Sequence, residues 1–296
     1  MSQSFDVIVI GEGIAGLSAA GALAKAGLSV ATFEQQLFGG LVINVNELDP
    51  APPGGEAGGA AFAAEMTGVN AEAGVTSIQE AVTAMTAGSI STAAGEYRAR
   101  HIIIASGAQL KKLGVPGEAE FEGRGVSTCA DCDGPMFQNE TVVVVGGGDS
   151  ALQEAHVLTQ YCGKVILVHR GPAFRAQAHF VDAVTHNDKI EIRFNTTVDA
   201  ILGGQMVEKV RLTSAAGSDE LPCAGVFAYI GLTPNTDFVP DTISRDDTGR
   251  IITGETLETA LPGVWAIGAV RSGCGGSLQH AMDEASAVAA AIAQRR

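Results

Sequence analysis

Short apolar runs that end in glycine recur along the chain, and they predict parallel strands followed by helices. Residues 5–10 form a β-branched run of strand length, residues 17–25 are rich in Ala and Leu, and residues 29–33 form a second apolar run. Gly27 ends the Ala/Leu-rich segment, as glycine commonly ends helices. The pattern predicts a strand, a helix and a second strand, which is the order of a βαβ unit with buried parallel strands.

The first turn of this unit has the glycine spacing of a dinucleotide-binding loop. Such glycines let the backbone approach a pyrophosphate at the N terminus of the helix. Glu34 ends the second strand, where an acid accepts a hydrogen bond from a ribose hydroxyl. An ordinary βαβ turn is the alternative, but here the strands, glycines, helix and acid occur together. The glycines are Gly11, Gly13 and Gly16.

A second copy of the unit follows later in the chain. Residues 141–145 and 164–168 predict its strands, and the helix between them runs to about Tyr161. His169 and Arg170 stand where the first copy has its acid, and Arg175 follows. A cation there suits the 2′-phosphate of NADP, which an acid would repel; a solvated basic turn is the alternative. The turn that opens the helix reads Gly146-Gly147-Gly148-Asp149-Ser150-Ala151.

Several other segments contribute to the expected fold. Residues 48–64 are rich in Pro, Gly and Ala and predict a surface loop that leads into a helix. Residues 96–104 predict a strand pair. Residues 111–125 are polar and marked by Pro and Gly, which is typical of a domain boundary. Residues 190–229 predict alternating short strands, with a turn at 203–204.

The C-terminal segments predict that the second unit is inserted into the first. The first unit lacks enough strands to close its sheet before residue 115, so the strand expected at 261–269 and the helix expected at 278–294 return to it. We therefore expect an α/β protein with two nested Rossmann-like, three-layer nucleotide-binding domains. One domain comprises residues 1–115 plus 240–296, and the inserted domain comprises residues 116–239.

Two cysteines three residues apart stand between the two glycine loops. Cys129 and Cys132 can close a disulfide, and Asp133 follows with a carboxyl group that can carry a proton. A redox dithiol needs one sulfur to attack, one to resolve and an acid to protonate the leaving thiolate. Half of a zinc site would look the same, but the chain has no second Cys or His pair at ligand spacing.

Composition and charge exclude several classes. The net charge of −15 and the pI near 4.7 argue against nucleic acid and against an anionic membrane surface as partners. No leader and no membrane-spanning apolar run is evident, so we expect a soluble cytoplasmic protein. In a reducing compartment, a Cys-x-x-Cys pair among only five cysteines is more typical of catalysis than of a structural staple.

Two nested nucleotide folds with Cys129-Ala130-Asp131-Cys132-Asp133 just before the second glycine loop resemble the low-molecular-weight thioredoxin reductase family. The resemblance extends over nearly the whole chain. It implies FAD on the first domain, NADPH on the second and a homodimer. It also implies that Cys132 faces the flavin, that Cys129 passes electrons onward and that Asp133 is the acid/base. The FAD contacts would be Gly11, Gly13, Gly16, Glu34, Gly40, Ser106, Gly107, Gly268 and Gln279, and the NADPH contacts would be Gly146, Gly148, Ser150, His169, Arg170 and Arg175.

The chain departs from the family pattern at four places. Gly171 replaces the second of two consecutive arginines, which predicts a weaker preference for NADPH and leaves NADH possible. Leu41 replaces a glutamine near the flavin, Ala269 replaces an aspartate that holds FAD, and Leu278 replaces an arginine. These changes indicate a divergent member, and they put the electron acceptor in doubt more than the fold.

The remaining thiols and three functions stay open at this stage. Cys274 could be a third thiol near the flavin or incidental, with His280 as another replacement contact, whereas Cys162 and Cys223 are expected to be packed thiols. The leading function is an NADPH-dependent flavoprotein that reduces a protein or small-molecule disulfide, without a metal. A dithiol oxidase that uses oxygen and a non-catalytic flavin-binding partner subunit are the alternatives. The basic residues His169, Arg170 and Arg175 favour the NADPH-dependent reductase, because an oxidase needs no pyridine nucleotide.

Overall fold

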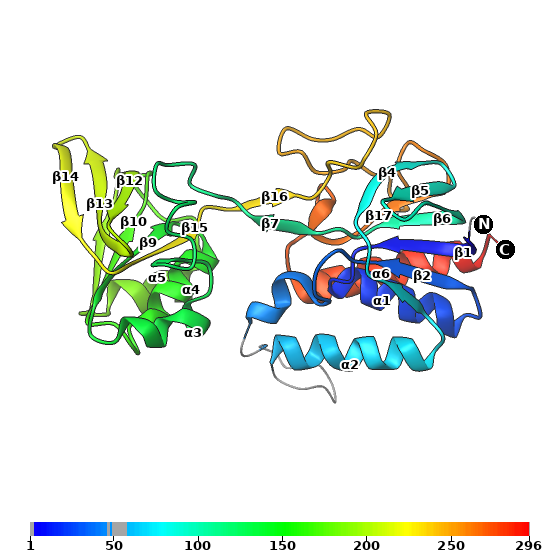
Figure 1. Ribbon diagram of the computed structural model, residues 1–296, viewed down its shortest axis with the longest axis horizontal. Coiled ribbons are helices and arrows are strands. Elements are labelled where there is room, and N and C mark those ends of the chain that lie inside the picture. Colours follow the sequence, from blue (N-terminus) through cyan, green and yellow to red (C-terminus); the bar gives the residue numbers. More distant parts are fainter. Residues whose placement is uncertain (1–2, 46–47, 49–57, 296) are drawn as a thin grey trace. The chain divides into compact units, whose positions relative to one another are not determined.

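The computed structural model describes residues 3–45, 48 and 58–295 (Figure 1). The chain divides into two compact units, Met1–Gln109 with Thr233–Arg296, and Leu110–Leu232. The second unit is thus inserted into the first, and both boundaries lie slightly earlier in the chain than expected. The chain crosses between the units within two strands that pair with each other, β7 (Ala108–Leu110) and β16 (Leu232–Pro234).

The first unit is built on a seven-stranded sheet of order β3-β2-β1-β6-β5-β4, with β17 also paired to β6. Five strands of this sheet run parallel to one another: β1, β2, β3, β6 and β17. At one edge, β4 and β5 add an antiparallel pair. The strands are β1 (Gln3–Ile10), β2 (Val30–Phe33), β3 (Thr76–Ile78), β4 (Val82–Thr86), β5 (Ser89–Thr92), β6 (Glu96–Ile104) and β17 (Val264–Ala266).

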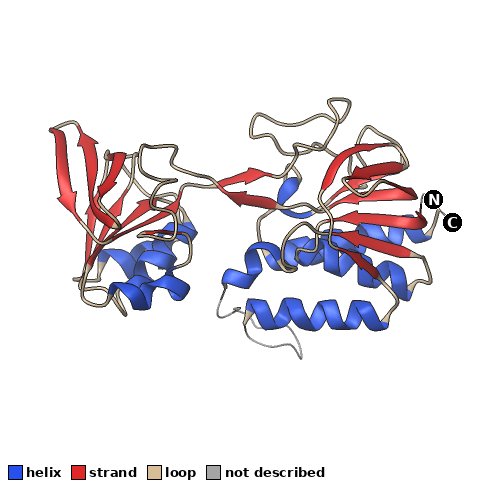
Figure 2. Ribbon diagram, viewed as in Figure 1, coloured by secondary structure: helices blue, strands red, loops and turns tan. Residues whose placement is uncertain are grey.

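Helices cover one face of this sheet (Figure 2). Small side chains such as Ala19 and Ala285 are fully buried in the cluster that joins the first and last helices to the sheet, and they permit close packing. Trp265 is fully buried in the same cluster. The helices are α1 (Ile14–Lys25), α2 (Gly59–Glu72) and α6 (Leu278–Ala293), with short 3₁₀ turns η1 (Gly40–Asn44) and η3 (Gly268–Val270).

The segment expected to form a strand pair is a single strand. β6 pairs with β1 from Tyr97 to Ile104 in one register, and its first residues also pair with β5. Residues 96–104 contain no glycine or proline, so nothing interrupts the ladder. The loop expected over residues 48–64 lies largely outside the described residues, and α2 begins at Gly59.

The second unit is a parallel five-stranded sheet of order β11-β10-β9-β15-β8. Helices pack on one face, and a three-stranded antiparallel sheet packs on the other, so the unit has three layers. Its strands are β8 (Val126–Ser127), β9 (Thr141–Gly146), β10 (Lys164–Val168), β11 (Ile190–Arg193), β12 (Thr197–Gly203), β13 (Val207–Ser214), β14 (Gly217–Pro222) and β15 (Gly225–Tyr229). Its helices are α3 (Ala130–Asp133), η2 (Gly134–Phe137), α4 (Asp149–Leu158) and α5 (Ala178–Thr185).

Sequence reasoning missed α5 and extended α4 too far. α5 is only eight residues long, and its buried face reduces to Val184 with the partly buried Phe180 and Val181. Such a short stripe gives little periodic signal. α4 ends at Leu158, whose carbonyl oxygen accepts the amide of Cys162 at 2.8 Å. Within the part of the chain that the structure describes, no helix combines the length and apolarity needed to cross a bilayer.

Candidate nucleotide and dithiol sites

The carboxyl ends of the parallel strands of the first unit bring its candidate residues to one edge of the sheet. Ile10 is in register with both Phe33 and Ile104, and Ile104 is in register with Ala266. Residues that follow these strands therefore lie along one edge, where open α/β sheets bind their ligands. The candidates that follow them are Gly11, Gly13, Gly16, Glu34, Ser106, Gly107 and Gly268.

The glycine loop fits a bound pyrophosphate. A Cβ on Gly11 would lie 2.4 Å from the Ala105 carbonyl oxygen, and a Cβ on Gly16 would lie 2.0 Å from the Gly11 carbonyl oxygen. These two glycines are required by the backbone itself. Gly13 caps α1, and no side chain caps that N terminus. A Cβ there would meet nothing nearer than 4.0 Å, which leaves the helix N terminus accessible to an anion.

Glu34 supports the glycine loop as well as ending β2. Its Oε2 accepts the amide of Glu12 at 3.0 Å, and its Oε1 accepts the amides of Gln35 and Gln36. Gly40 lies beside this loop, because a Cβ on Gly40 would lie 3.5 Å from the Gly13 Cα. The structure therefore brings Gly40 to the glycine loop.

Ser106 has a structural role that the sequence did not indicate. Its hydroxyl donates to the Asn235 carbonyl oxygen at 2.7 Å, and the Asn235 side-chain amide donates to the Ser106 carbonyl oxygen at 2.8 Å. This reciprocal pair ties residues at the two ends of the insertion. Gly107 follows with a positive φ of 65°.

A buried glutamate organises the region around Ala269. Glu284, 4% exposed, accepts the amide of Gly268 at 2.6 Å and forms an ion pair with Arg271. Ala269 is half-buried beside it. Gln279 lies in the first turn of α6, with its side chain bonded to Asp283. Ala269 thus stands where the resemblance predicts an aspartate, next to Gly268, whose amide already donates to the Glu284 carboxylate.

The second glycine loop shares its first glycine and its helix cap with the first loop, although Ala151 stands where the first loop has Gly16. A Cβ on Gly146 would lie 2.4 Å from the Tyr229 carbonyl oxygen, whereas a Cβ on Gly148 would meet no atom within 4 Å. Gly148 caps α4 without a side-chain cap, and Ser150 in the first turn is exposed. This N terminus also fits a phosphate.

His169 does not supply the cation that its position suggested. The residue is 7% exposed, and a Cβ on Gly147 would lie only 2.3 Å from its ring. Burial lowers the pKa of His169 below its ordinary value, and Arg175 and Arg170 lower it further. The ring is therefore a neutral support for the glycine loop at physiological pH.

Arg170 and Arg175 remain as the positive charges of the turn. Both are exposed, and neither makes an ion pair within the described ranges. The amide of Arg175 donates to the Gly147 carbonyl oxygen at 2.8 Å, which fixes this arginine beside the glycine loop. A Cβ on Gly171 would lie 2.9 Å from His169 Nε2, so an arginine there would require the ring to move.

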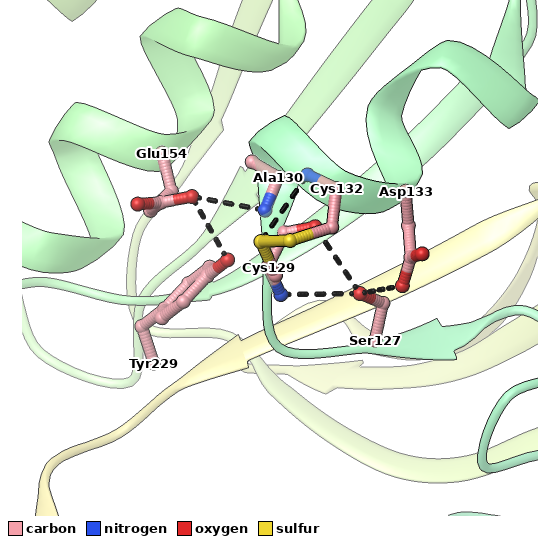
Figure 3. Close-up of a disulfide and its surroundings, with 7 residues drawn as sticks. All are labelled: Ser127, Cys129, Ala130, Cys132, Asp133, Glu154 and Tyr229. Carbon is pink, nitrogen blue, oxygen red and sulfur yellow. Dashed lines mark hydrogen bonds between the residues drawn. A yellow bond between two sulfur atoms is a disulfide. The ribbon is translucent and has the colours of Figure 1, made fainter. Parts of the chain in front are cut away.

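Cys129 caps the N terminus of α3 and forms a disulfide with Cys132 inside that helix, with their Cα atoms 5.3 Å apart (Figure 3). Cys129 is 8% exposed, whereas Cys132 is exposed. The Cys132 amide donates to Cys129 Sγ at 3.2 Å. The bond between the two sulfurs supports a redox pair over half of a zinc site. The difference in exposure gives the two sulfurs different access to an acceptor.

Ser127 holds the candidate acid against the same loop. Its hydroxyl donates to Asp133 Oδ2 at 2.6 Å and accepts the Cys129 amide at 3.1 Å (Figure 3). Asp133 is thereby fixed one residue after Cys132. Ser127 was missed in the sequence, although its place two residues before Cys129 is the signal that could have indicated it.

Glu154 and Tyr229 lie on the other side of Cys129 and were also missed. Glu154 Oε2 accepts the Ala130 amide at 3.0 Å and the Tyr229 hydroxyl at 3.2 Å. Burial raises the pKa of Glu154, although these two hydrogen bonds oppose the shift. Burial, with the neighbouring Glu154 carboxylate, also raises the pKa of Tyr229. Nothing in the local sequence around the cysteines signals either residue.

The other thiols are poor nucleophiles. Burial raises the pKa of Cys162 to about 11 and that of Cys223 to about 12, in agreement with the expected packed thiols. Cys274 is half-buried, and burial raises its pKa as well. Its sulfur lies within 4.8 Å of ligand atoms of His280 and Glu284. His280 Nδ1 already accepts the Gly275 amide, and Glu284 is paired with Arg271, so we assign no metal to this cluster.

Comparison with known proteins decides the family. The family model described as pyridine nucleotide-disulphide oxidoreductase matches residues 5–285. The chain belongs to this family. It is 38% identical over 281 residues to a thioredoxin reductase of Treponema pallidum, with 92% of this chain and 91% of that protein covered. It is 39% identical over 275 residues to a thioredoxin reductase of Listeria innocua, with 90% and 86% covered.

A solved structure agrees with these relatives. The crystal structure of Lactococcus lactis thioredoxin reductase in its FR conformation matches with a TM-score of 0.91 at 32% identity, and 98% of each chain is covered. The expected family, α/β fold and enzyme class are confirmed: the chain is a thioredoxin reductase-like NAD(P)H:disulfide oxidoreductase. The Cys129–Cys132 pair is the part of this oxidoreductase suited to be its redox-active disulfide.

Proposed function

We propose that this oxidoreductase passes electrons from NADPH, bound at the second glycine loop, through FAD, bound at the first, to the Cys129–Cys132 disulfide and then to thioredoxin or a similar protein disulfide. The observation that carries the proposal is the disulfide itself, one of whose residues is exposed beside a held carboxyl group. FAD supplies the two-electron link between a hydride donor and a disulfide. The thioredoxin reductases to which the chain is similar support thioredoxin as the acceptor.

The burial of the two sulfurs supports an order of attack opposite to the one that the resemblance implied. A protein partner reaches the exposed Cys132, whereas Cys129 is enclosed. The Cys132 thiolate attacks one sulfur of the acceptor disulfide, and the other acceptor sulfur leaves and takes a proton, for which Asp133 is the nearby acid. Cys129 then attacks Cys132, which re-forms the enzyme disulfide and releases the second acceptor thiol.

The test is an anaerobic titration followed by turnover. The purified protein should carry a flavin absorbance band that NADPH bleaches, and it should then reduce oxidised thioredoxin. A protein that stays colourless after FAD is added would contradict the proposal. Oxygen consumption driven by a small dithiol without NADPH would instead establish the oxidase alternative.

Two further parts of the proposal concern assembly and location. We propose a homodimer, as the resemblance implies, and sedimentation of the purified protein tests it. We also propose a cytoplasmic location, because thiols there are kept reduced and a Cys-x-x-Cys pair can cycle.

Arg170 and Arg175 are expected to set the coenzyme preference. A charge-assisted hydrogen bond to a phosphate contributes about 1.5–3 kcal/mol. Arg170→Gln or Arg175→Gln should therefore raise KM for NADPH by roughly 10- to 100-fold and leave KM for NADH nearly unchanged. Steady-state kinetics with both coenzymes provide the measurement.

Arg211→Gln is the matched control, because Arg211 is an exposed arginine of the same unit that lies on β13. It should change neither KM value. Equal use of NADH and NADPH by the unmodified enzyme would show that Gly171 has already removed the phosphate preference.

A further inference from the structure

The carboxylate of Glu154 connects three elements around the disulfide (Figure 3). Glu154 belongs to α4, Tyr229 ends β15, and Ala130 begins α3 directly after Cys129. One oxygen, Glu154 Oε2, accepts both the Tyr229 hydroxyl and the Ala130 amide. The Ala130 amide is thereby fixed by a side chain distant in sequence.

The surroundings of this contact are shielded from water. Ala130 is fully buried, Tyr229 is 7% exposed and Cys129 is 8% exposed. Charges interact more strongly where water is excluded, and a negative charge raises the pKa of a neighbouring acid. An ionised Glu154 would therefore oppose ionisation of a Cys129 thiol, whereas the hydrogen bond from the Cys132 amide to Cys129 Sγ would favour it.

We propose that Glu154 is a positioning residue of the dithiol: its carboxylate holds the segment after Cys129, and its charge keeps the reduced Cys129 as a thiol. This proposal rests on the proposed dithiol function. Reduction adds two electrons, breaks the sulfur–sulfur bond and leaves two sulfurs that take up to two protons. With Glu154 charged, the first of these protons remains on Cys129. The exposed Cys132 is then the sulfur that stays ionised and attacks the acceptor.

Other ionisable groups near Glu154 do not replace it. Asp131 on α3 acts on Glu154 from the same side as Ala130 and raises its pKa. Tyr229 stays neutral because burial raises its own pKa. On α4 itself, Asp149 is held by Gln177 at the N-terminal end of the helix, and His156 is exposed.

The decisive variant is Glu154→Gln, which keeps an oxygen acceptor for Ala130 and Tyr229 and removes only the charge. The protein is reduced with dithiothreitol, and iodoacetamide labelling of Cys129 and Cys132 is followed separately by peptide mass spectrometry between pH 5 and 10. We expect the apparent pKa of Cys129 to fall by about one unit, a tenfold change in its acid dissociation constant, and that of Cys132 to change less. Glu154→Asp should retain the charge and stay near the original value.

A second readout is the dithiol–disulfide equilibrium with glutathione. Above the Cys129 pKa of the unmodified enzyme, Glu154→Gln should favour the dithiol by about tenfold, which corresponds to a reduction potential about 30 mV less negative. Tyr229→Phe removes one of the two hydrogen bonds that hold the Glu154 carboxylate, so it should shift the Cys129 pKa in the same direction by a smaller amount. His156→Gln, an exposed change on the same helix, is the control and should shift neither quantity.

An unchanged Cys129 pKa in folded Glu154→Gln protein would overturn this proposal and leave the dithiol function intact. An exposed Cys132 that dithiothreitol never makes available to iodoacetamide would instead contradict the proposed function itself, because the disulfide would then not be reducible. The two failures are therefore distinguishable in one set of samples.

Discussion

Cys129→Ser is expected to stop thioredoxin reduction and to accumulate a mixed disulfide between the enzyme and thioredoxin. Cys132 is exposed and can still attack the acceptor, but no second thiol is then available to resolve the product. Cys132→Ser should also stop turnover, but without a mixed disulfide, because the remaining Cys129 is enclosed. Reduction of the flavin by NADPH should continue in both variants. Non-reducing gels and mass spectrometry detect the mixed disulfide.

Cys274→Ser is the matched control, because Cys274 is a half-buried thiol outside the pair. It should turn over thioredoxin at the original rate. A mixed disulfide that forms in Cys132→Ser and not in Cys129→Ser would show that Cys129 is the attacking sulfur, as the family resemblance implied. Turnover in all three variants would show that the disulfide is not part of the reaction.

Asp133→Asn is expected to lower turnover with a protein disulfide by roughly 10²- to 10⁴-fold, the usual contribution of a positioned general acid. Asparagine keeps the size of the side chain and can still accept the Ser127 hydroxyl, so the loop geometry should persist. Ser127→Ala should cause a smaller loss, because it releases the Asp133 carboxyl group without removing it. Rapid-mixing measurements of dithiol–disulfide exchange separate this step from flavin reduction.

Asp131→Asn controls for the loss of one negative charge in the same four-residue helix. It should leave exchange nearly unchanged, since the Ser127 hydroxyl donates to Asp133 and not to Asp131. An equal loss in Asp131→Asn and Asp133→Asn would assign the effect to net charge and not to proton transfer.

The sequence alone predicted most of the fold because strand, glycine turn and helix succeed one another locally. Gly11 and Gly146 have positive φ angles, and a Cβ on either residue would lie 2.4 Å from a carbonyl oxygen, so no other residue suits them. The same local pattern placed Cys129 and Cys132 close enough to bond. It failed where a signal was short, as at α5, or where one strand has two kinds of partner, as in β6.

Only the tertiary structure decided what each candidate side chain can do. Burial under Gly147 makes His169 a neutral support, although its position in the sequence is that of a cation. Ser106 is engaged by Asn235, a residue from the far end of the insertion. Glu154 and Tyr229 meet Ala130 only because α4 and β15 pack beside α3. Spacing along the chain indicates which residues share a loop, but ionisation and access depend on neighbours that only folding brings together.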